Sequence, residues 1–327
     1  MQIIVRAPNW LGDAIMALPV FAALRAAYPD ASIVAAAREN LRAVFTGAAD
    51  EFLAVPRGAA LLKNALTLRS RSIDLGVLLT NSFATAAWLF LTGTKRRVGY
   101  ARDARGFLLT DAIKPTPEIL AAHQADYYFA LLKKIGGARE NAPRLTVDDA
   151  AASEAAKFLA AKNLTAGDYA VIAPCSAFGA VKDWAIERYA AVAARLYAER
   201  QIPALFTGTA GQREMINAVA GAGVSNAAGE LTLGGLFGVL RSAKFFLGGD
   251  SGAAHAAAAL DVPAFVIFGI TEPSRTRPLG GKVQLIGKGG LATPDLRSPV
   301  IQRAARQALD AITVEEVVEA IFNLIKN

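Results

Sequence analysis

Short apolar runs alternate with longer amphipathic segments along the first half of the chain. The apolar runs at residues 3–7, 32–36, 51–55 and 75–79 have the length and composition of buried β-strands. Strands that are covered on both faces by crossover helices give this pattern. We therefore predict a parallel sheet of the α/β fold class, with helices at residues 14–28, 41–45, 59–68 and 84–91.

The same alternation restarts near residue 169 and predicts a second domain of the same class. Asn163 and Thr165 interrupt an alanine-rich helix, so we place the domain boundary there, with domains at residues 1–165 and 166–327. Ligands of open α/β sheets bind outside the carboxyl ends of the strands, so two facing domains predict an interdomain cleft. The second domain is predicted to contain strands 169–174, 204–207, 245–248 and 264–268 and helices 186–199, 212–220, 233–242, 253–260 and 314–325, the last capped by Thr313.

The composition narrows the class of partner and the compartment. The 327 residues are 54% hydrophobic and 19% charged, enough for two cores, and the formal net charge of +7 favours an anionic partner. Cys175 is the only cysteine, which excludes an intrachain disulfide and a cysteine-rich zinc site and fits a cytoplasmic setting. Residues 75–94 carry no charge, but Thr80, Asn81 and Ser82 in their middle predict a strand, a loop and a helix rather than a membrane span.

The loop APNWLGD at residues 7–13 joins the first predicted strand to the first helix. It contains neither G-x-G-x-x-G nor a Walker A sequence, so a nicotinamide dinucleotide site and a P-loop lack sequence support. Gly12 permits a tight turn, and Asp13 brings a carboxylate to the carboxyl edge of the sheet. A helix N-cap is the ordinary alternative for Asp13, because an aspartate there accepts hydrogen bonds from free backbone amides.

The loop at residues 174–184 of the second domain combines small residues with a hydroxyl and a cation. Ser176 and Lys182 suit a diphosphate, whereas a turn serine and a solvated lysine are the ordinary alternative. Cys175 has no histidine and aspartate partners near it in sequence, so we assign it no chemistry.

The sequence GGDSGAAH at residues 248–255 ends a strand and begins a helix of small residues. Asp250 would accept from sugar hydroxyls, while Ser251 and the Gly252 amide would donate to phosphate oxygens. The alternative is that Asp250 or Ser251 is a plain N-cap and that His255 is a buried core side chain.

Other strand ends give weaker signals. Thr271 in the loop at residues 268–273 and Asn226 at the start of 226–230 would lie near a nucleotide. Lys95, Arg96 and Arg97, followed by Arg102 and Arg105, would meet an acidic acceptor or anionic lipid, unless they form a solvated loop or a charged strand edge. Tyr100 is the only aromatic residue within 95–105, which argues against nucleic acid as the partner.

Five segments, in the same order along the chain, resemble the signatures of the ADP-heptose:lipopolysaccharide heptosyltransferases. The resemblance implies a GT-B fold, with two facing Rossmann-like domains that bind the acceptor in the first and the donor in the second. It also implies inverting, metal-independent transfer of L-glycero-D-manno-heptose from ADP-heptose to the lipopolysaccharide inner core. The asparagine Asn226 and the stretch AFGAVKDW favour type II, which adds the second heptose. The segments lie at residues 7–29, 81–83, 95–110, 174–184 and 248–273.

By this resemblance Asp13 is the general base, Lys182 binds phosphate, and Asp250, Ser251 and Gly252 form the donor loop. Neither a cofactor nor a metal is expected. The complete expected site comprises Asp13 and Lys182 as catalytic residues, with Ser176, Lys182, Asn226, Asp250, Ser251, Gly252 and Thr271 at the donor and Asn9, Trp10, Asn81, Arg97 and Arg105 at the acceptor.

Three positions depart from the family pattern, since Cys175, Gly249 and Ile270 stand where other residues are common. The expected partners are ADP-heptose and a phosphorylated inner-core acceptor, met by a monomer at the cytoplasmic face of the inner membrane. A type I or III heptosyltransferase, or an enzyme of another surface glycan, is the alternative within the class. A nucleotide-sugar binding protein without activity is the alternative outside it.

Overall fold

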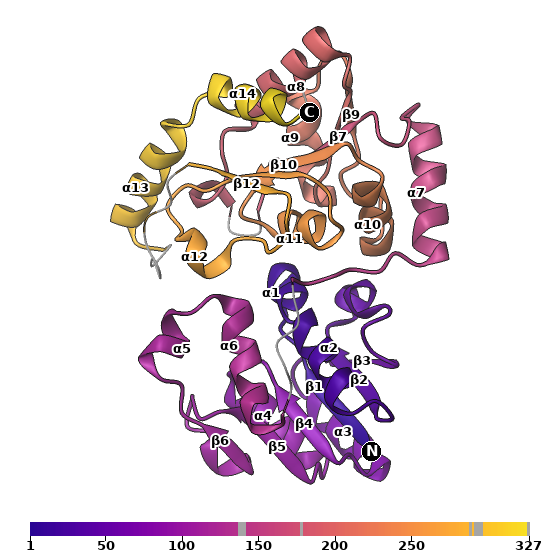
Figure 1. The fold of residues 1–327 in the computed structure, drawn as a ribbon, viewed down its shortest axis with the longest axis vertical. Coiled ribbons are helices and arrows are strands. Elements are labelled where there is room, and N and C mark those ends of the chain that lie inside the picture. Colours follow the sequence, from indigo (N-terminus) through magenta and orange to yellow (C-terminus); the bar gives the residue numbers. More distant parts are fainter. Residues whose placement is uncertain (137–141, 177–178, 288–289, 291–296, 326–327) are drawn as a thin grey trace. The chain divides into compact units, whose positions relative to one another are not determined.

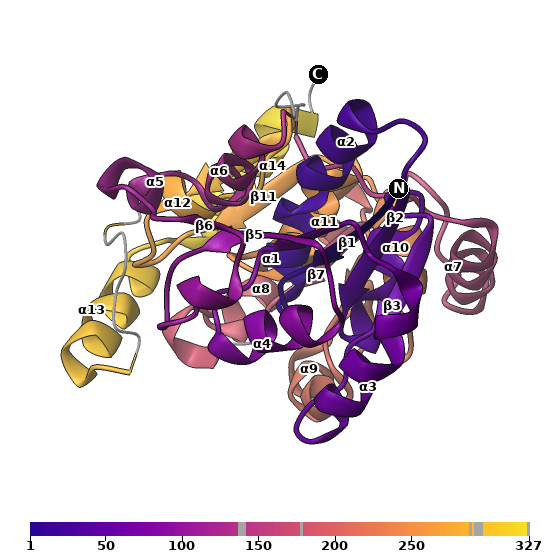
Figure 2. The ribbon, with the colours of Figure 1, turned by 90° about the horizontal axis from the view of Figure 1, so that it is seen from below.

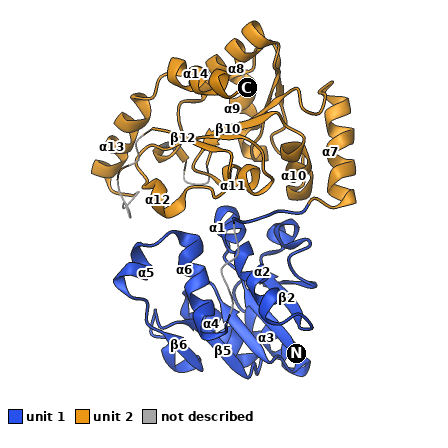
Figure 3. Ribbon diagram, viewed as in Figure 1, with its two compact units in different colours: residues 1–146 blue, residues 147–327 orange. Residues whose placement is uncertain are grey.

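The computed structural model describes residues 1–325 except 137–141, 177–178, 288–289 and 291–296. The chain divides into two compact units, Met1–Thr146 and Val147–Asn327 (Figure 3). In the described residues each unit is built on a six-stranded sheet in which every neighbouring pair of strands is parallel (Figure 1). The predicted fold class is confirmed.

Unit 1 has the strand order β3-β2-β1-β4-β5-β6. Seen from below in Figure 2, α2 and α6 lie on one side of its sheet and α3 and α4 on the other. The strands are β1 (Gln2–Arg6), β2 (Ser32–Ala37), β3 (Glu51–Ala54), β4 (Leu75–Leu78), β5 (Arg96–Tyr100) and β6 (Asp111–Ile113). The helices are α1 (Leu11–Met16), α2 (Leu18–Ala27), α3 (Ala60–Leu68), α4 (Phe83–Leu91), α5 (Pro117–Ala121) and α6 (Gln124–Ala130), with 3₁₀ turns η1 (Glu39–Phe45), η2 (Arg69–Arg71), η3 (Gly106–Leu108) and η4 (Leu131–Lys134).

The sequence predicted the first four strands of unit 1 but not β5 and β6. The helix predicted at residues 14–28 is two helices, because Pro19 at the start of α2 has no N–H with which to continue the ladder of α1. The uncharged stretch at residues 75–94 forms β4 and α4, as predicted. Within the part of the chain that the structure describes, no helix has both the length and the apolar character needed to cross a membrane.

Unit 2 has the strand order β12-β11-β10-β7-β8-β9. Its core joins side chains of the sheet, such as Ile172, Leu247 and Phe265, to Trp184 and to Val317 of the last helix. The strands are β7 (Ala170–Ala173), β8 (Ala204–Phe206), β9 (Val224–Asn226), β10 (Phe245–Gly249), β11 (Ala264–Ile267) and β12 (Val283–Ile286). The helices are α7 (Asp149–Ala161), α8 (Ile186–Arg200), α9 (Arg213–Val219), α10 (Leu233–Arg241), α11 (Gly252–Ala259), α12 (Pro273–Thr276), α13 (Pro299–Asp310) and α14 (Val314–Ile325), with 3₁₀ turns η5 (Gly179–Val181) and η6 (Ala210–Gln212). Thr313 caps α14, its hydroxyl accepting from the Glu316 amide at 3.2 Å.

The division between the units lies before α7, whereas the sequence placed the domain boundary after it, at residues 165/166. Helix α7 packs on α10 of unit 2 so closely that a Cβ at Gly238 would lie 2.6 Å from the Ala155 Cβ. The Glu154 carboxylate also accepts from the Thr232 amide at 2.8 Å. These contacts, which the turn residues near 165 do not reveal, fix α7 in unit 2.

Both sheets reverse their order at one point. In unit 1 the chain runs outward through β1, β2 and β3 and returns to place β4 beside β1, and in unit 2 β10 returns to lie beside β7. Ligands of open α/β sheets bind at such a reversal, at the carboxyl ends of the strands. The loops after β1, β4, β7 and β10 are therefore the places to look for a site.

Candidate functional site

Asp13 lies at the reversal of the unit 1 sheet, in the first turn of α1, which follows β1. The N-cap of α1 is Trp10, and no side chain makes a capping hydrogen bond there. The N-cap alternative for Asp13 is therefore not what the structure shows.

Tyr128 of α6 donates a hydrogen bond from its hydroxyl to the Asp13 Oδ1, at 3.1 Å. Burial, followed by the charge of Asp13, raises the pKa of Tyr128 well above its usual value, so the phenol keeps its proton and acts as a donor. The sequence analysis missed this residue. The two partners are 115 positions apart, and no local pattern links them.

Asn81 follows β4 at the same reversal and is held from two sides. Its Oδ1 accepts from the Tyr127 hydroxyl at 3.1 Å and from the Arg105 Nη2 at 3.4 Å. Arg105 is fully buried and also donates to the carbonyl oxygens of Tyr100, at 2.9 Å, and Thr80, at 2.5 Å. Arg105 thus joins the loops after β4 and β5. Because its side chain is buried and bound to the protein's own carbonyl groups, the structure does not support its predicted contact with an acceptor.

Asn9 and Trp10, the other residues predicted at the acceptor, lie in the loop between β1 and α1. Both are exposed, Trp10 by 57%, which is unusual for so large an apolar side chain. The Asn9 Oδ1 accepts from the Arg6 Nη2 at 2.8 Å, so Arg6 fixes the direction of this side chain.

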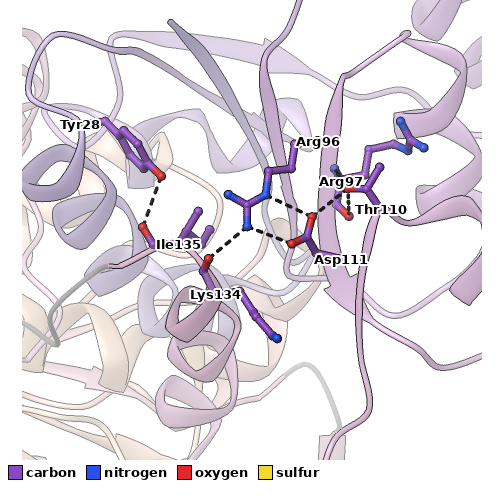
Figure 4. Close-up of polar contacts among 7 residues, drawn as sticks. All are labelled: Tyr28, Arg96, Arg97, Thr110, Asp111, Lys134 and Ile135. Atoms are coloured by element: carbon purple, nitrogen blue, oxygen red, sulfur yellow. Dashed lines mark hydrogen bonds and ion pairs between the residues drawn. The ribbon is translucent and has the colours of Figure 1, made fainter.

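The basic run that begins at Lys95 is engaged within unit 1. Figure 4 shows Arg96 bound to Asp111, with a closest distance of 2.9 Å, and to the Lys134 carbonyl oxygen. Arg97 donates to the carbonyl oxygens of Leu108, at 2.7 Å, and Thr94, at 2.6 Å. Arg97 pairs in register with Gly76, near the amino end of β4. The structure therefore places Arg97 toward the opposite edge of the sheet from Asn81, and we leave it out of the candidate site.

Lys182 and Asp250 meet at the reversal of the unit 2 sheet. The Lys182 Nζ lies 2.6 Å from the Asp250 Oδ2, and the two side chains are only 13% and 7% exposed. The Thr271 Oγ1, from the loop after β11, lies 3.3 Å from the same carboxylate oxygen. Three residues that the sequence predicted at the donor thus converge from three loops.

Ser251 is the N-cap of α11, with its Oγ accepting from the Ala254 amide at 3.5 Å. Gly252 is the first residue of the helix, so its amide belongs to the group of amides without a partner inside α11. His255 is buried within the same helix. The capping alternative thus holds for Ser251, and it places the positive end of α11 next to Asp250.

Ser176 follows β7 and lies against Asp183. Its amide donates to the Asp183 Oδ1 at 2.7 Å. Burial raises the pKa of Asp183, although Ser176 and Lys182 oppose the shift. Burial and the charge of Asp183 raise the pKa of the Cys175 thiol to about 11, which agrees with assigning it no chemistry.

Asn226 ends β9, the edge strand of the unit 2 sheet, and its side chain holds the chain around it. Its Nδ2 donates to the Arg213 carbonyl oxygen at 3.0 Å and to the Asn217 Oδ1 at 2.7 Å, while its Oδ1 accepts from the Ala228 amide at 2.8 Å. These bonds leave the predicted donor contact without support.

The described residues contain no group of three or more His, Cys, Asp and Glu side chains arranged to hold a metal ion. The candidate site residues form two groups. In unit 1 the Asp13 carboxylate lies with Tyr128 and Asn81 at one sheet reversal. In unit 2 the pair of Lys182 and Asp250 lies beside the N-terminus of α11. The first can accept a proton, and the second can bind a diphosphate.

Comparison with known proteins finds relatives that are similar to this chain over most of its length. Lipopolysaccharide heptosyltransferase 2 of Salmonella typhimurium is 28% identical to this chain over 99% of both proteins, and that of Escherichia coli K12 is 28% identical over 88% of both. The structure of the E. coli ADP-heptose lipopolysaccharide heptosyltransferase II superposes with a TM-score of 0.84 at 26% identity, covering 99% of this chain and 98% of that one.

A family 9 glycosyltransferase of Veillonella parvula shares the fold, with a TM-score of 0.88 at 20% identity over 99% of this chain and 96% of that one. The sequence profile of glycosyltransferase family 9 (heptosyltransferase) matches residues 61–303, which is most of the sequence. The chain therefore belongs to glycosyltransferase family 9, the heptosyltransferase family, and is a glycosyltransferase with the GT-B fold.

Proposed function

We propose that the enzyme transfers L-glycero-D-manno-heptose from ADP-heptose to the phosphorylated inner core of lipopolysaccharide, where it adds the second heptose. The relatives named heptosyltransferase 2 align with nearly the whole chain, which supports this acceptor. The observation that carries the proposal is the buried pair of Lys182 and Asp250 at the N-terminus of α11, because it offers a cation, a carboxylate and free amides to one nucleotide sugar.

In the donor half of the reaction, Lys182 and the first amides of α11 bind the diphosphate. An ammonium group has three N–H donors, so a bond to Asp250 does not by itself prevent Lys182 from reaching a phosphate oxygen. Negative charge develops on the departing ADP, and donors that are already in place stabilise it. Asp250 accepts from a hydroxyl of the sugar.

In the acceptor half, Asp13 removes the proton of the attacking hydroxyl. The acceptor oxygen forms a bond to the anomeric carbon while the bond from that carbon to the phosphate oxygen breaks, and its electron pair leaves with ADP. A single displacement of this kind inverts the anomeric configuration. Tyr128 binds one carboxylate oxygen of Asp13 and so sets the direction of the base.

The protein's own positive groups are proposed to replace a metal, so transfer should persist in excess EDTA; loss of activity that Mg²⁺ restores would contradict this.

Because the proposed acceptor is a membrane lipid, the enzyme would act as a peripheral monomer at the cytoplasmic face of the inner membrane. Co-sedimentation with vesicles that carry the acceptor tests that contact, and sedimentation equally strong without the acceptor would point to a general lipid affinity instead.

The proposal is tested by measuring ADP release from ADP-heptose with three acceptors that carry no heptose, one heptose or two heptoses. Release with the one-heptose acceptor alone is expected. A preference for either of the others would assign a type I or type III reaction, and release with none would contradict heptose transfer.

Asp13→Asn serves as the matched control, because it preserves the size of the side chain. It should retain ADP affinity in calorimetry and lose turnover by about 10²-fold or more. Near-normal turnover of this variant would remove Asp13 from the role of base.

A further inference from the structure

Three arginines follow three neighbouring strands of unit 1 at the same edge of the sheet. Arg6 is the last residue of β1, Arg38 comes directly after β2, and Arg57 follows β3. In register, Arg6 lies opposite Ala36, and Ala37 lies opposite Ala54. All three arginines therefore start from the carboxyl edge, where open α/β sheets bind their ligands.

Arg6 is a buried cation, only 3% exposed, and its hydrogen-bond acceptors among the described residues are all neutral. Its Nη1 donates to the carbonyl oxygens of Ala7 and Ala36, and its Nη2 to the Asn9 Oδ1. Its Nε is buried and has no hydrogen-bond partner within the described part of the chain. Burying a charge without an opposite charge is costly, so this arrangement favours the binding of an anion.

Arg38, which follows the neighbouring strand β2, has a similar guanidinium group. Its Nε is also buried and has no hydrogen-bond partner among the described residues. Burial lowers the pKa of Arg6 to about 10, and the charge of Arg38 contributes to this shift. Burial also lowers the pKa of Arg38, with a smaller contribution from the charge of Arg57. The charges of neighbouring arginines thus repel each other, Arg38 with Arg6 and Arg57 with Arg38, and with a pKa of about 10 Arg6 remains protonated at neutral pH.

The carboxylates nearest in sequence to Arg38 and Arg57 bind other partners. Glu39, next to Arg38, forms an ion pair with Arg42 at 2.7 Å, and Glu51, at the start of β3, forms one with Arg71 at 2.7 Å. The positive charge of the three arginines is therefore not cancelled by these two acids, and the buried Nε groups still lack acceptors.

We propose that Arg6, Arg38 and Arg57 form a binding site for one oxyanion, a phosphate or carboxylate group. Such a group would accept from guanidinium N–H groups at this edge of the sheet and supply the missing negative charge. The site lies beside the loop that carries Asn9 and Asp13. Given the proposed function, on which this last step rests, the oxyanion belongs to the acceptor and determines which acceptor the enzyme accepts.

The first test is calorimetric titration of the folded full-length protein with inorganic phosphate at about 150 mM salt, where the charges of exposed side chains are screened beyond about 8 Å. All variants carry Lys182→Ala, so that the diphosphate site of unit 2 does not contribute. Arg38→Ala and Arg57→Ala should each weaken phosphate binding about tenfold, the effect of losing one charged hydrogen bond or ion pair. Lys63→Ala, which removes an exposed charge of α3 in the same unit, is the control and should leave the affinity unchanged.

Equal affinity of Arg38→Ala and its parent would overturn the site, and so would an equal loss in Lys63→Ala. This titration requires no turnover, so its failure is distinct from failure of heptose transfer. Arg6→Gln is less suitable, since the buried side chain also supports the fold.

The second test compares acceptors with and without an anionic substituent, using Arg38→Ala with intact Lys182. The variant should raise KM about tenfold for the anionic acceptor, leave kcat unchanged, and leave KM for the neutral acceptor unchanged. An equal effect on both acceptors, or on neither, would assign the site to a free oxyanion and overturn the link to the acceptor.

Discussion

The pair of Lys182 and Asp250 predicts a specific pattern of stability in three variants, Lys182→Met, Asp250→Asn and the double variant. At 2.6 Å and an effective dielectric constant of about 20, the attraction of the two charges is about 6 kcal/mol. Desolvation of both groups offsets most of this, so the intact pair contributes little net stability. Removing either charge removes this attraction, while the cost of desolvating the remaining group stays, and the difference is about 3 kcal/mol.

Thermal unfolding of the ligand-free protein measures this cost. For a unit of the size of unit 2, residues 147–327, about 3 kcal/mol corresponds to a Tm lower by about 6–12 °C. The relevant transition is the one that ADP shifts in the wild type, since a ligand stabilises the unit that binds it. Each single variant should show this loss, and the double variant should lose less than the sum by at least about 3 °C, because it leaves no buried charge unpaired.

The control is Arg195→Met, which breaks an ion pair between α8 residues that are 40% and 42% exposed. An exposed pair contributes at most about 1 kcal/mol, so Tm should fall by less than about 4 °C. Calorimetry with ADP separates the roles further. Lys182→Met should weaken ADP binding about tenfold or more, whereas Asp250→Asn should not weaken it. Additive Tm losses in the double variant would refute the reasoning, because they would mean that the two charges do not depend on each other.

Three further results are expected. Tyr128→Phe should lower kcat about tenfold and leave ADP affinity unchanged, since it removes one hydrogen bond to Asp13, and an unchanged kcat would separate the tyrosine from the base. Burial raises the pKa of Asp183 in the folded protein above its unfolded value of about 3.9. The free energy of unfolding therefore falls as the pH rises from the unfolded pKa through the folded pKa, because the buried carboxyl group must then carry a charge. Asp183→Asn, which still accepts from Ser176, should therefore raise Tm at pH 7 but not below about pH 4, and a gain confined to acid would contradict this. Cys175, with a thiol pKa of about 11, should react with iodoacetamide at pH 8 at least about tenfold more slowly than free cysteine, and Cys175→Ala should retain activity.

The sequence predicted the strands whose apolar runs are continuous and missed those that depend on their neighbours. Strand β5 begins with Arg96 and Arg97, so it lacks the continuous apolar run by which a buried strand is recognised. In the sheet these arginines find acceptors at Asp111 and at carbonyl oxygens, so their charge is compatible with the position of β5 between β4 and β6. A single-sequence pattern contains no information on pairing of this kind.

The same difference separates the site residues that were predicted from those that were not. Asp250 stands directly after β10, and Asp13 and Lys182 lie in the segments that follow β1 and β7, so this local signal located them. Tyr128 and Arg6 have ordinary sequence surroundings. Only the folded chain brings the tyrosine hydroxyl to Asp13 and leaves the buried guanidinium without a carboxylate.

Strand order also explains why Asn226 departs from its expected role. Strand β9 lies two strands from β7, and neighbouring strands are about 4.8 Å apart, so Asn226 starts about 10 Å along the sheet from the loop that carries Ser176. A diphosphate at the reversal point would reach it only through the nucleoside, and the amide group of Asn226 already bonds to three neighbours. Closeness to the reversal is therefore a stronger criterion for a binding residue in this fold than a polar side chain at a strand end.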